Sequence, residues 1–414
     1  MIDIQFIRDN PDLVQQNAAK KGYDVDITQL LGFDTKRREL LSTVEELRRQ
    51  RNEIADSMKG SKPSIEQIQK GKDLKEQLSG LEHQLLSIEQ SFNELLLQVP
   101  NMMMADVPVG GEEDSVEISR FGDQKHGAMD HLDLAVKKGW VDFERGAKVA
   151  GTKFYFLKGD SALLENALIQ FGLQFATKNN FTYMTVPHLV NARTATGTGF
   201  APRTSDQGDE YYVEGEDLSL IATAEIPLTG FHADEIIDEK DLPIRYAGLS
   251  PCYRKEAGTY GKHTRGLFRV HQFNKLEMYA FTVPENSAQM HETIRGIEEE
   301  IWQALNIPYR VVNIASGDLG APAAKKYDIE YWSPVDGAYR ELTSCSNCTD
   351  YQARNLNIRV RRKDGTIQSL HTLNGTVVSL ARSLVAIIEN YQTPEGDVMI
   401  PEVLKPFMGG KERI

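Results

Sequence analysis

The densest group of side chains that could carry out chemistry lies between Tyr253 and Glu277. It contains six cations, interrupted by glycines and flanked by apolar residues: Arg254, Lys255, Lys262, Arg265, Arg269 and Lys275. A basic loop between two strands can bind phosphates, and arginine adds a planar fork of N–H donors that lysine lacks. Glu256 and Glu277 would be costly beside apolar strands unless a cation or a ligand amine meets them. An exposed charged hairpin is the competing interpretation.

A second candidate for chemistry is the pair Cys345 and Cys348. The chain has only 3 cysteines, and its 9 histidines show no metal-ligand spacing. A single Cys-x-x-Cys without a second pair indicates packing or a polar loop, and zinc binding or redox chemistry is the less favoured alternative.

Composition narrows the class of protein. The 414 residues include 47 Lys and Arg against 60 Asp and Glu, a net charge of −13. This charge excludes a protein that binds nucleic acid by bulk attraction but allows a local basic patch. No stretch approaches the ~18 consecutive apolar residues of a membrane span, and the charged start MIDIQFIRDN lacks a signal core. We therefore expect a cytoplasmic protein without a membrane partner.

The first hundred residues carry a heptad pattern on each side of Pro63. Before it, Phe33, Leu40, Leu47 and Ile54 are spaced by seven. After it, eight apolar residues alternate at steps of four and three: Leu74, Leu78, Leu81, Leu85, Ile88, Phe92, Leu95 and Val99. This seam predicts an antiparallel coiled-coil hairpin with helices at 35–59 and 65–98. The first helix has more cations than acids, which is either a solvated face or a basic patch: Lys36, Arg37, Arg38, Arg48, Arg49, Arg51 and Lys59.

The pattern of the remaining chain predicts a domain of mixed helices and strands. Helical periodicity recurs at 162–176 and 285–304, and short strands are plausible at 183–187, 269–281 and 309–313. Strands and helices alternate irregularly and no Gly-rich dinucleotide turn follows a strand, so a mostly antiparallel sheet flanked by helices is expected. The fold class is therefore α+β, with a helical domain at 1–102 and a second domain at 103–414.

Several motifs together resemble one family. The pattern Arg254-Lys255-Glu256, a long loop, then Arg269-Val270-His271-Gln272-Phe273 and Lys275-Leu276-Glu277 is similar to the second signature motif of class II aminoacyl-tRNA synthetases, in its seryl-tRNA synthetase form. Thr223-Ala224-Glu225 resembles that family's serine-binding motif. Residues 341–354 resemble its next segment, 373–376 with Arg382 its third motif, and 153–187 its first motif. The resemblance runs essentially from end to end, and the helical hairpin matches the family's arm.

The resemblance implies an ATP-dependent ligase. It would activate L-serine as seryl-adenylate and transfer the seryl group to tRNA(Ser), and to tRNA(Sec) where present. It also implies a class II catalytic domain at 103–414, a homodimer with the first motif at its interface, and Mg²⁺ as cofactor.

The resemblance assigns site residues as well. Arg254 would bridge the α-phosphate of ATP and the serine carboxylate, Arg382 would hold the γ-phosphate, and these two are the expected catalytic residues. The expected ATP site also contains Lys255, Glu256, Val270, Phe273, Glu341, Leu342, Thr343 and Ser344. Within it, Glu256 would accept from the adenine amino group and Phe273 would stack on the ring. Glu341 and Ser344 would be the magnesium ligands.

The expected serine site adds a second set of residues: Thr223, Ala224, Glu225, Arg254, Glu277, Asn374 and Thr376. Thr223 and Glu225 would receive the serine ammonium. Glu277 and Thr376, with Asn374 nearby, would read the hydroxyl. A buried polar pair that only a hydroxyl satisfies rejects alanine strongly.

Two alternatives remain at this point. The chain could be a non-catalytic paralogue that kept the fold, or a ligase that loads a carrier protein without tRNA. Val377 and Ala381 also stand where the family usually has glycine, which leaves the ATP affinity open.

Overall fold

The computed structural model describes residues 1–59, 64–200, 210–256 and 266–414. The chain divides into two compact units, residues 1–102 and 103–414. Each unit has its own hydrophobic clusters. The expected cations Lys262 and Arg265 lie outside the described residues.

The first unit is entirely helical in its described part. It contains α1 (Ile4–Asp9), α2 (Pro11–Lys20), α3 (Ile27–Ser57) and α4 (Ile65–Gln98). α1 and α2 pack on the start of α3 and the end of α4. The buried apolar side chains of this contact include Ile7, Val14, Leu30, Phe92 and Val99. α3 begins eight residues earlier than the heptad pattern predicted, because the Asp26 carboxylate caps it by accepting from the Gln29 backbone N–H at 2.8 Å.

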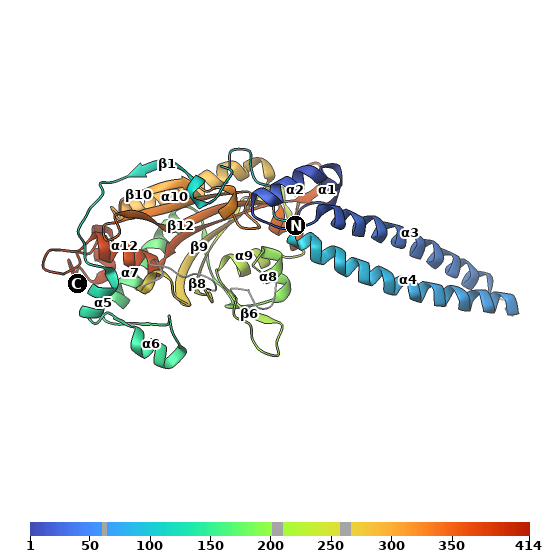
Figure 1. Cartoon of the computed structure of the whole chain (residues 1–414), viewed down its shortest axis with the longest axis horizontal. Helices are drawn as coiled ribbons and strands as arrows, with labels where there is room; N and C mark the ends of the chain where they lie inside the picture. Colours follow the sequence, from blue (N-terminus) through green and yellow to red (C-terminus); the bar gives the residue numbers. More distant parts are fainter. Residues whose placement is uncertain (60–63, 201–209, 257–265) are drawn as a thin grey trace. The chain divides into compact units, whose positions relative to one another are not determined.

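The two long helices form the predicted antiparallel hairpin, side by side in Figure 1. Val44 on α3 packs with Leu78 and Leu85 on α4, flanked by Leu40, Leu41, Leu47 and Leu81. Arg48 and Glu82 pair across the seam at 2.7 Å. α4 starts where predicted, with the Ser64 hydroxyl and the Gln67 side chain forming a capping box.

The second unit is built on an eight-stranded sheet in the order β1-β10-β11-β12-β15-β9-β8-β4. In this order the strands are Val116–Phe121, Tyr309–Asn313, Lys325–Ser333, Ala338–Thr349, His371–Ser379, Gln272–Thr282, Ile244–Tyr253 and Thr182–Thr185. Neighbouring strands are antiparallel, except that β4 and β8 are parallel. The prediction of a mostly antiparallel sheet is confirmed.

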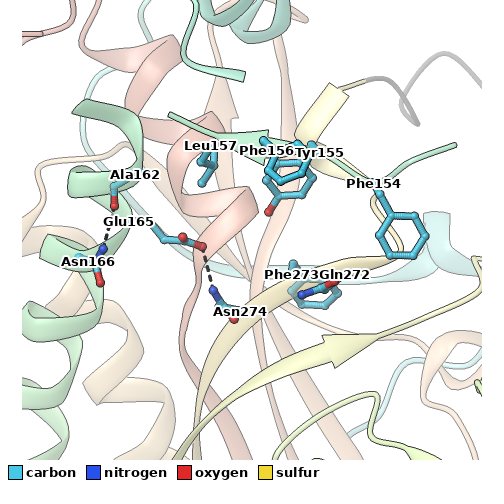
Figure 2. A pocket seen from close by; sticks show the side chains of 10 residues that line it. All are labelled: Phe154, Tyr155, Phe156, Leu157, Ala162, Glu165, Asn166, Gln272, Phe273 and Asn274. Carbon is cyan, nitrogen blue, oxygen red and sulfur yellow. Dashed lines mark hydrogen bonds between the residues drawn. The ribbon is translucent and has the colours of Figure 1, made fainter. Parts of the chain in front are cut away.

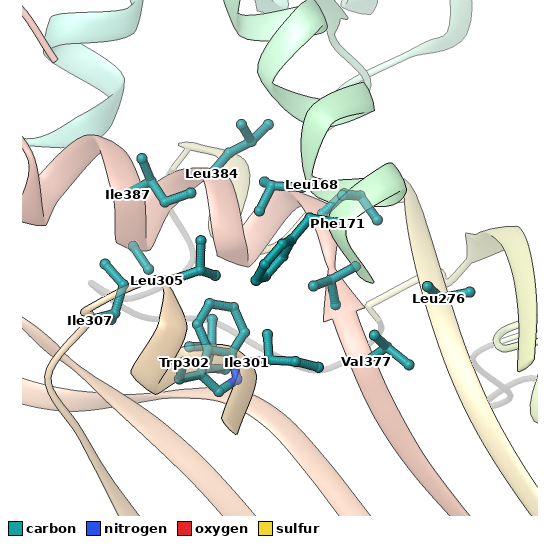
Figure 3. Close-up of a cluster of buried hydrophobic side chains, with 14 of the residues drawn as sticks. Leu168, Phe171, Leu276, Ile301, Trp302, Leu305, Ile307, Val377, Leu384 and Ile387 are labelled. Atoms are coloured by element: carbon teal, nitrogen blue, oxygen red, sulfur yellow. The ribbon is translucent and has the colours of Figure 1, made fainter. Parts of the chain in front are cut away.

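Helices α7 (Asp160–Lys178), α10 (Ser287–Ala304) and α12 (Leu380–Asn390) contact the sheet and contribute to one large buried cluster. Figure 3 shows Phe171 of α7, Trp302 of α10 and Leu384 of α12 close together in this cluster. Both long predicted helices of this unit are present. The second starts at Ser287, because Pro284–Asn286 forms a 3₁₀ turn ahead of it.

Short elements complete the second unit. The helices are α5 (His131–Lys137), α6 (Phe143–Ala150), α8 (Ala192–Thr198), α9 (Glu225–Gly230) and α11 (Tyr351–Asn355). The strands are β2 (Val141–Asp142), β3 (Phe156–Leu157), β5 (Leu189–Asn191), β6 (Leu218–Leu220), β7 (Ile236–Asp238), β13 (Arg359–Arg361) and β14 (Ile367–Ser369). Among the described helices, none combines the length and apolarity that a membrane crossing requires.

The hairpin seam generates a testable prediction. Leu78 is 2% exposed in the seam, whereas Leu86 on the same helix is 65% exposed. Leu78→Ala should destabilise the hairpin by about 2–5 kcal/mol, because a cavity replaces the buried side chain. Hydrogen–deuterium exchange of peptides from 65–98 in the full chain measures this. Leu86→Ala is the matched control and should change exchange little. Equal effects of the two substitutions would contradict the seam.

Candidate active site

The hairpin of β8 and β9 positions Arg254. The Arg254 backbone N–H donates to the His271 carbonyl at 3.0 Å, and the His271 ring Nδ1 lies 2.9 Å from the Arg254 carbonyl. These bonds extend the strand pairing past Tyr253. The Arg254 guanidinium carbon lies 5.3 Å from the centroid of the Phe273 ring. The predicted phosphate-binding guanidinium and the predicted base platform are thus neighbours.

The residues after Arg254 turn sharply. Glu256 has a φ of 51°, in the left-handed region, and its carboxylate pairs with Arg269 at 3.3 Å. The Lys255 ammonium lies 5.8 Å from the Tyr212 ring centroid. Val270 is buried, so only its backbone is suited to contact a ligand.

Strand β12 and helix α12 bring the second guanidinium to the site. Arg382 forms an ion pair with Glu341 at 2.7 Å, and its guanidinium carbon lies 5.1 Å from the Phe268 ring centroid. Loss of water alone would raise the pKa of the Glu341 carboxyl, but the charges of Arg382 and Lys326 outweigh this and lower it to about 2. Glu341 is therefore an ionised carboxylate whose present partner is a cation that phosphate could take over.

The neighbours of Glu341 on β12 divide between the two faces of the sheet. Leu342 is buried in the main core. Thr343 is 2% exposed, and its hydroxyl donates to Glu298 of α10 at 2.8 Å. Any contact of Leu342 or Thr343 with a nucleotide on the open face must come from the backbone, since both side chains are committed elsewhere. Ser344 is the next residue and, by the alternation of a strand, points the opposite way from Thr343.

A second group of carboxylates, Glu225 and Glu277, is almost completely buried at the same sheet. Glu225, the first residue of α9, is 5% exposed and accepts from Asn374 at 2.9 Å and from Gln352 at 2.7 Å. Burial raises the pKa of Glu225 to about 7, and the nearby charge of Glu277 adds to the rise. The Thr223 hydroxyl accepts from the Glu225 backbone N–H at 3.3 Å, which fixes the start of the helix.

Glu277 on β9 is 1% exposed and completes this group. It pairs with Lys275 at 2.7 Å, and the Thr376 hydroxyl donates to it at 3.4 Å from the opposite position on β15. The sequence grouped Lys275 with the phosphate-binding cations. The structure instead buries it against Glu277, because that carboxylate needs a compensating charge.

Gln352 on α11 is a residue that the sequence analysis missed. It is fully buried, and its Nε2 donates to Glu225 and to the Thr198 carbonyl at 3.2 Å. Its Oε1 accepts from the Tyr279 hydroxyl at 2.8 Å and the Thr372 hydroxyl at 2.7 Å. Gln352 therefore holds Glu225 in place. Its position within the family-like segment was the one available signal, because burial of a glutamine is not visible in a single sequence.

The sulfur of Cys348 accepts from Asn374 Nδ2 at 3.7 Å. Cys345 and Cys348 are both buried, and neither is in a disulfide. Burial raises the pKa of the Cys345 thiol well above its usual value, which disfavours the thiolate that zinc binding and redox exchange need. Among the described residues, no three His, Cys, Asp or Glu side chains are arranged to hold a metal ion. Glu341 and Ser344 offer two oxygens, a donor set that suits Mg²⁺ when phosphates supply the other ligands.

A pocket of about 290 Å³ lies beside the start of β9. Figure 2 shows Phe154, Phe156 and Leu157 on one side and Glu165 of α7 on another. Asn274 donates to the Glu165 carboxyl at 3.2 Å, and burial raises the pKa of that carboxyl. Phe156 at its edge is 45% exposed, so this part of the expected first motif presents apolar surface.

Family models match both units. The seryl-tRNA synthetase N-terminal domain matches residues 1–103, and the class II tRNA synthetase core domain (G, H, P, S and T) matches residues 210–391. Serine–tRNA ligase of Dictyoglomus thermophilum is 47% identical over 100% of this chain and 99% of its own length. That of Rubrobacter xylanophilus is 43% identical over 99% and 98%. The chain belongs to the seryl-tRNA synthetase family.

Solved structures of seryl-tRNA synthetases agree with this membership. The enzyme from Pyrococcus horikoshii, solved with ATP, has a TM-score of 0.90 and 40% identity, covering 100% of this chain and 99% of its own. The cytoplasmic enzyme from Naegleria fowleri, solved with AMP, has a TM-score of 0.83 and 34% identity, covering 98% and 95%. Because seryl-tRNA synthetases match the chain from end to end, neither a non-catalytic nor a carrier-directed paralogue is supported.

Proposed function

We propose that the carboxylates and guanidiniums of the sheet's open face catalyse the two steps of the seryl-tRNA synthetase reaction. A serine carboxylate oxygen attacks the α-phosphorus of ATP, the bond to the β-phosphate breaks, and pyrophosphate leaves. A hydroxyl of the terminal adenosine of tRNA(Ser) then attacks the seryl carbonyl and AMP leaves. The observation that carries this proposal is the placement of the two guanidiniums: Arg382 pairs with Glu341 at 2.7 Å, and the Arg254 guanidinium carbon lies 5.3 Å from the centroid of the Phe273 ring.

In this proposal the ATP site is assembled by exchange of partners. Arg382 leaves Glu341 for the γ-phosphate, while Arg254 stabilises the charge that builds on the α-phosphate. The adenine stacks on Phe273, and Glu256 accepts from its amino group. Glu341 and Ser344 would hold Mg²⁺, and the bound ion would neutralise part of the phosphate charge. Lys255 and the backbones of Val270, Leu342 and Thr343 would line the same site.

The serine site in this proposal is the buried carboxylate group. Glu225 and Thr223 receive the ammonium, with Ala224 lining the site beside them. Glu277, Thr376 and Asn374 read the hydroxyl. The support is burial: all six of these residues are at most 7% exposed, so an amino acid without a hydroxyl would leave polar groups unpaired.

The proposal extends to partners. The hairpin would bind tRNA through its backbone and shape, as a few dispersed cations allow. A homodimer is supported by the exposed Phe156 beside the pocket at the first motif. A cytoplasmic location fits the three cysteines, which are all buried and not in disulfides.

The deciding experiment is serine-dependent pyrophosphate exchange with the purified protein, ATP and magnesium. Arg254→Ala should lower exchange by about a hundredfold or more, because the transition-state charge loses its fixed cation. Arg193→Ala is a matched control, since Arg193 is 56% exposed and pairs with Asp234 on the surface. Near-normal exchange by a folded Arg254→Ala variant would remove Arg254 from the mechanism.

The raised pKa of Glu225 predicts a pH dependence. In the free protein Glu225 takes up a proton as the pH falls through about 7, whereas the serine ammonium needs the carboxylate. Serine binding therefore expels a proton at low pH, and the serine KM should rise by up to about tenfold per pH unit below that value. Above it, the KM should be level.

Exchange kinetics between about pH 6 and 8.5 measure this dependence. Glu225→Gln should show a high serine KM with a flat profile. Glu389→Gln is the control, because Glu389 is a buried acid held by His131, Tyr331 and Ser333, and it should keep the wild-type profile. A wild-type KM that does not vary across this range would refute the assignment of Glu225.

The hairpin offers a matched pair of cation sets. Among the described residues Lys36, Arg38 and Arg51 are exposed and have no ion-pair partner, whereas Arg48 pairs with Glu82 and Arg49 with Glu46. Replacing the first three with Gln should lower aminoacylation efficiency roughly tenfold and leave pyrophosphate exchange unchanged, because phosphate contacts are lost and adenylate chemistry is not touched. Arg48→Gln with Arg49→Gln should have a smaller effect. Equal losses in both sets would count against tRNA binding by this surface.

A further inference from the structure

The sheet splits between β12 and β15 beside the proposed site. Their ladder pairs Thr349 with Thr372 and continues to Cys345 opposite Gly375, where it stops. Within the described ladder, the next residues, Ser344 and Thr376, do not pair with each other. β12 goes on with β11, and β15 goes on with β9 through a bulge just after Thr376. The strands therefore part at Ser344 and Thr376, which belong to the proposed nucleotide and serine sites.

The side chain beneath this split is Glu298 of α10. It is fully buried, and Thr343 on β12 donates to its Oε2 at 2.8 Å. A Cβ added to Gly375 on β15 would lie 2.8 Å from Glu298 Oε1 and 2.2 Å from Ile294 Cγ2. The carboxyl thus contacts both strands at the point where they part, and only glycine at 375 leaves room for it.

The protonation state of the Glu298 carboxyl suits contacts with both strands. Burial raises the pKa of Glu298 well above its usual value, and the Thr343 hydroxyl and the Thr376 backbone partly oppose the rise. A neutral carboxyl has one donor and one acceptor. Its Oε1 lies under Gly375, the residue between Asn374 and Thr376. An apolar side chain would pack the same space without the cost of burying polar atoms.

We infer that Glu298 is a positioning residue for serine recognition: its carboxyl holds β12 and β15 apart and thereby directs Thr376 into the serine site. The inference rests on the proposed function, since Thr376 is assigned there to the serine hydroxyl. The inference goes beyond that function because it places a determinant of serine specificity on the far face of the sheet, where no ligand contact is possible.

Three substitutions in the full chain test this inference. Glu298→Gln keeps one donor and one acceptor and should leave the serine KM within about twofold of wild type. Glu298→Met keeps the length but removes both polar atoms. It should raise the serine KM about tenfold and weaken discrimination against alanine, while the ATP KM changes far less. Ile297→Ala, at the preceding residue of α10, which is also buried, controls for general loss of packing and should alter Tm without altering discrimination.

The outcomes separate the two proposals. If wild type shows no serine-dependent exchange, the proposed function fails. If wild type is active but Glu298→Met matches wild type, or only lowers Tm as Ile297→Ala does, the positioning role is overturned. Should Glu298→Met not fold, Thr343→Val and Thr343→Ser provide the second test. Serine discrimination should fall with Val and persist with Ser, and equal discrimination in both would overturn the inference.

Discussion

Compensation of buried charge is the constraint on which the rest of this structure depends. Glu225 and Glu277 are almost completely buried, where an isolated carboxylate is too costly to remain ionised. One is held by amide donors and has a raised pKa, and the other is held by Lys275. Glu225 takes its donors from α11 and β15, whereas Glu277 takes Lys275 from its own strand and a hydroxyl from Thr376 of β15. The two carboxylates therefore depend on the register between β9 and β15.

The two faces of the sheet divide the work. The far face is covered by α7, α10 and α12, whose apolar side chains form the main core with Leu276 and Val377 (Figure 3). Close packing makes this layer stiff, which suits a site that acts by placing groups and not by a protein nucleophile. Val377 and Ala381, where the family usually has glycine, are buried here. They add volume beneath the site and remove none of its charged groups.

The first unit follows different physics. Its long helices are stabilised by one narrow seam. Some of its cations pair with an acid on the same or the facing helix, and others have no ion-pair partner among the described residues. An ion pair on an exposed face contributes little to the stability of a fold. The hairpin therefore does not need acidic partners for its remaining cations, and these can bind a polyanion without destabilising it. In the proposed function, recognition of the large partner and chemistry on the small ones are assigned to two different compact units.

The sequence alone determined the local structure and the residue types of the site. Heptad spacing predicted the hairpin, and the irregular order of strands and helices predicted the mostly antiparallel sheet. The motif around Arg254 and Glu256 predicted which strands would bind the nucleotide. The sequence analysis did not recognise Asp26 as the residue that caps α3, so it predicted the start of this helix too late. Only the tertiary structure decided which charge meets which. It paired Arg382 with Glu341, turned Lys275 from a phosphate ligand into the partner of Glu277, and sent the Thr343 hydroxyl to the far face. The reason is that Glu341 and Thr343 meet partners on helices distant in the chain, Arg382 of α12 and Glu298 of α10. Lys275 and Glu277 are two residues apart on β9 and so share a face of the sheet, but only the burial of that face requires the two charges to compensate each other.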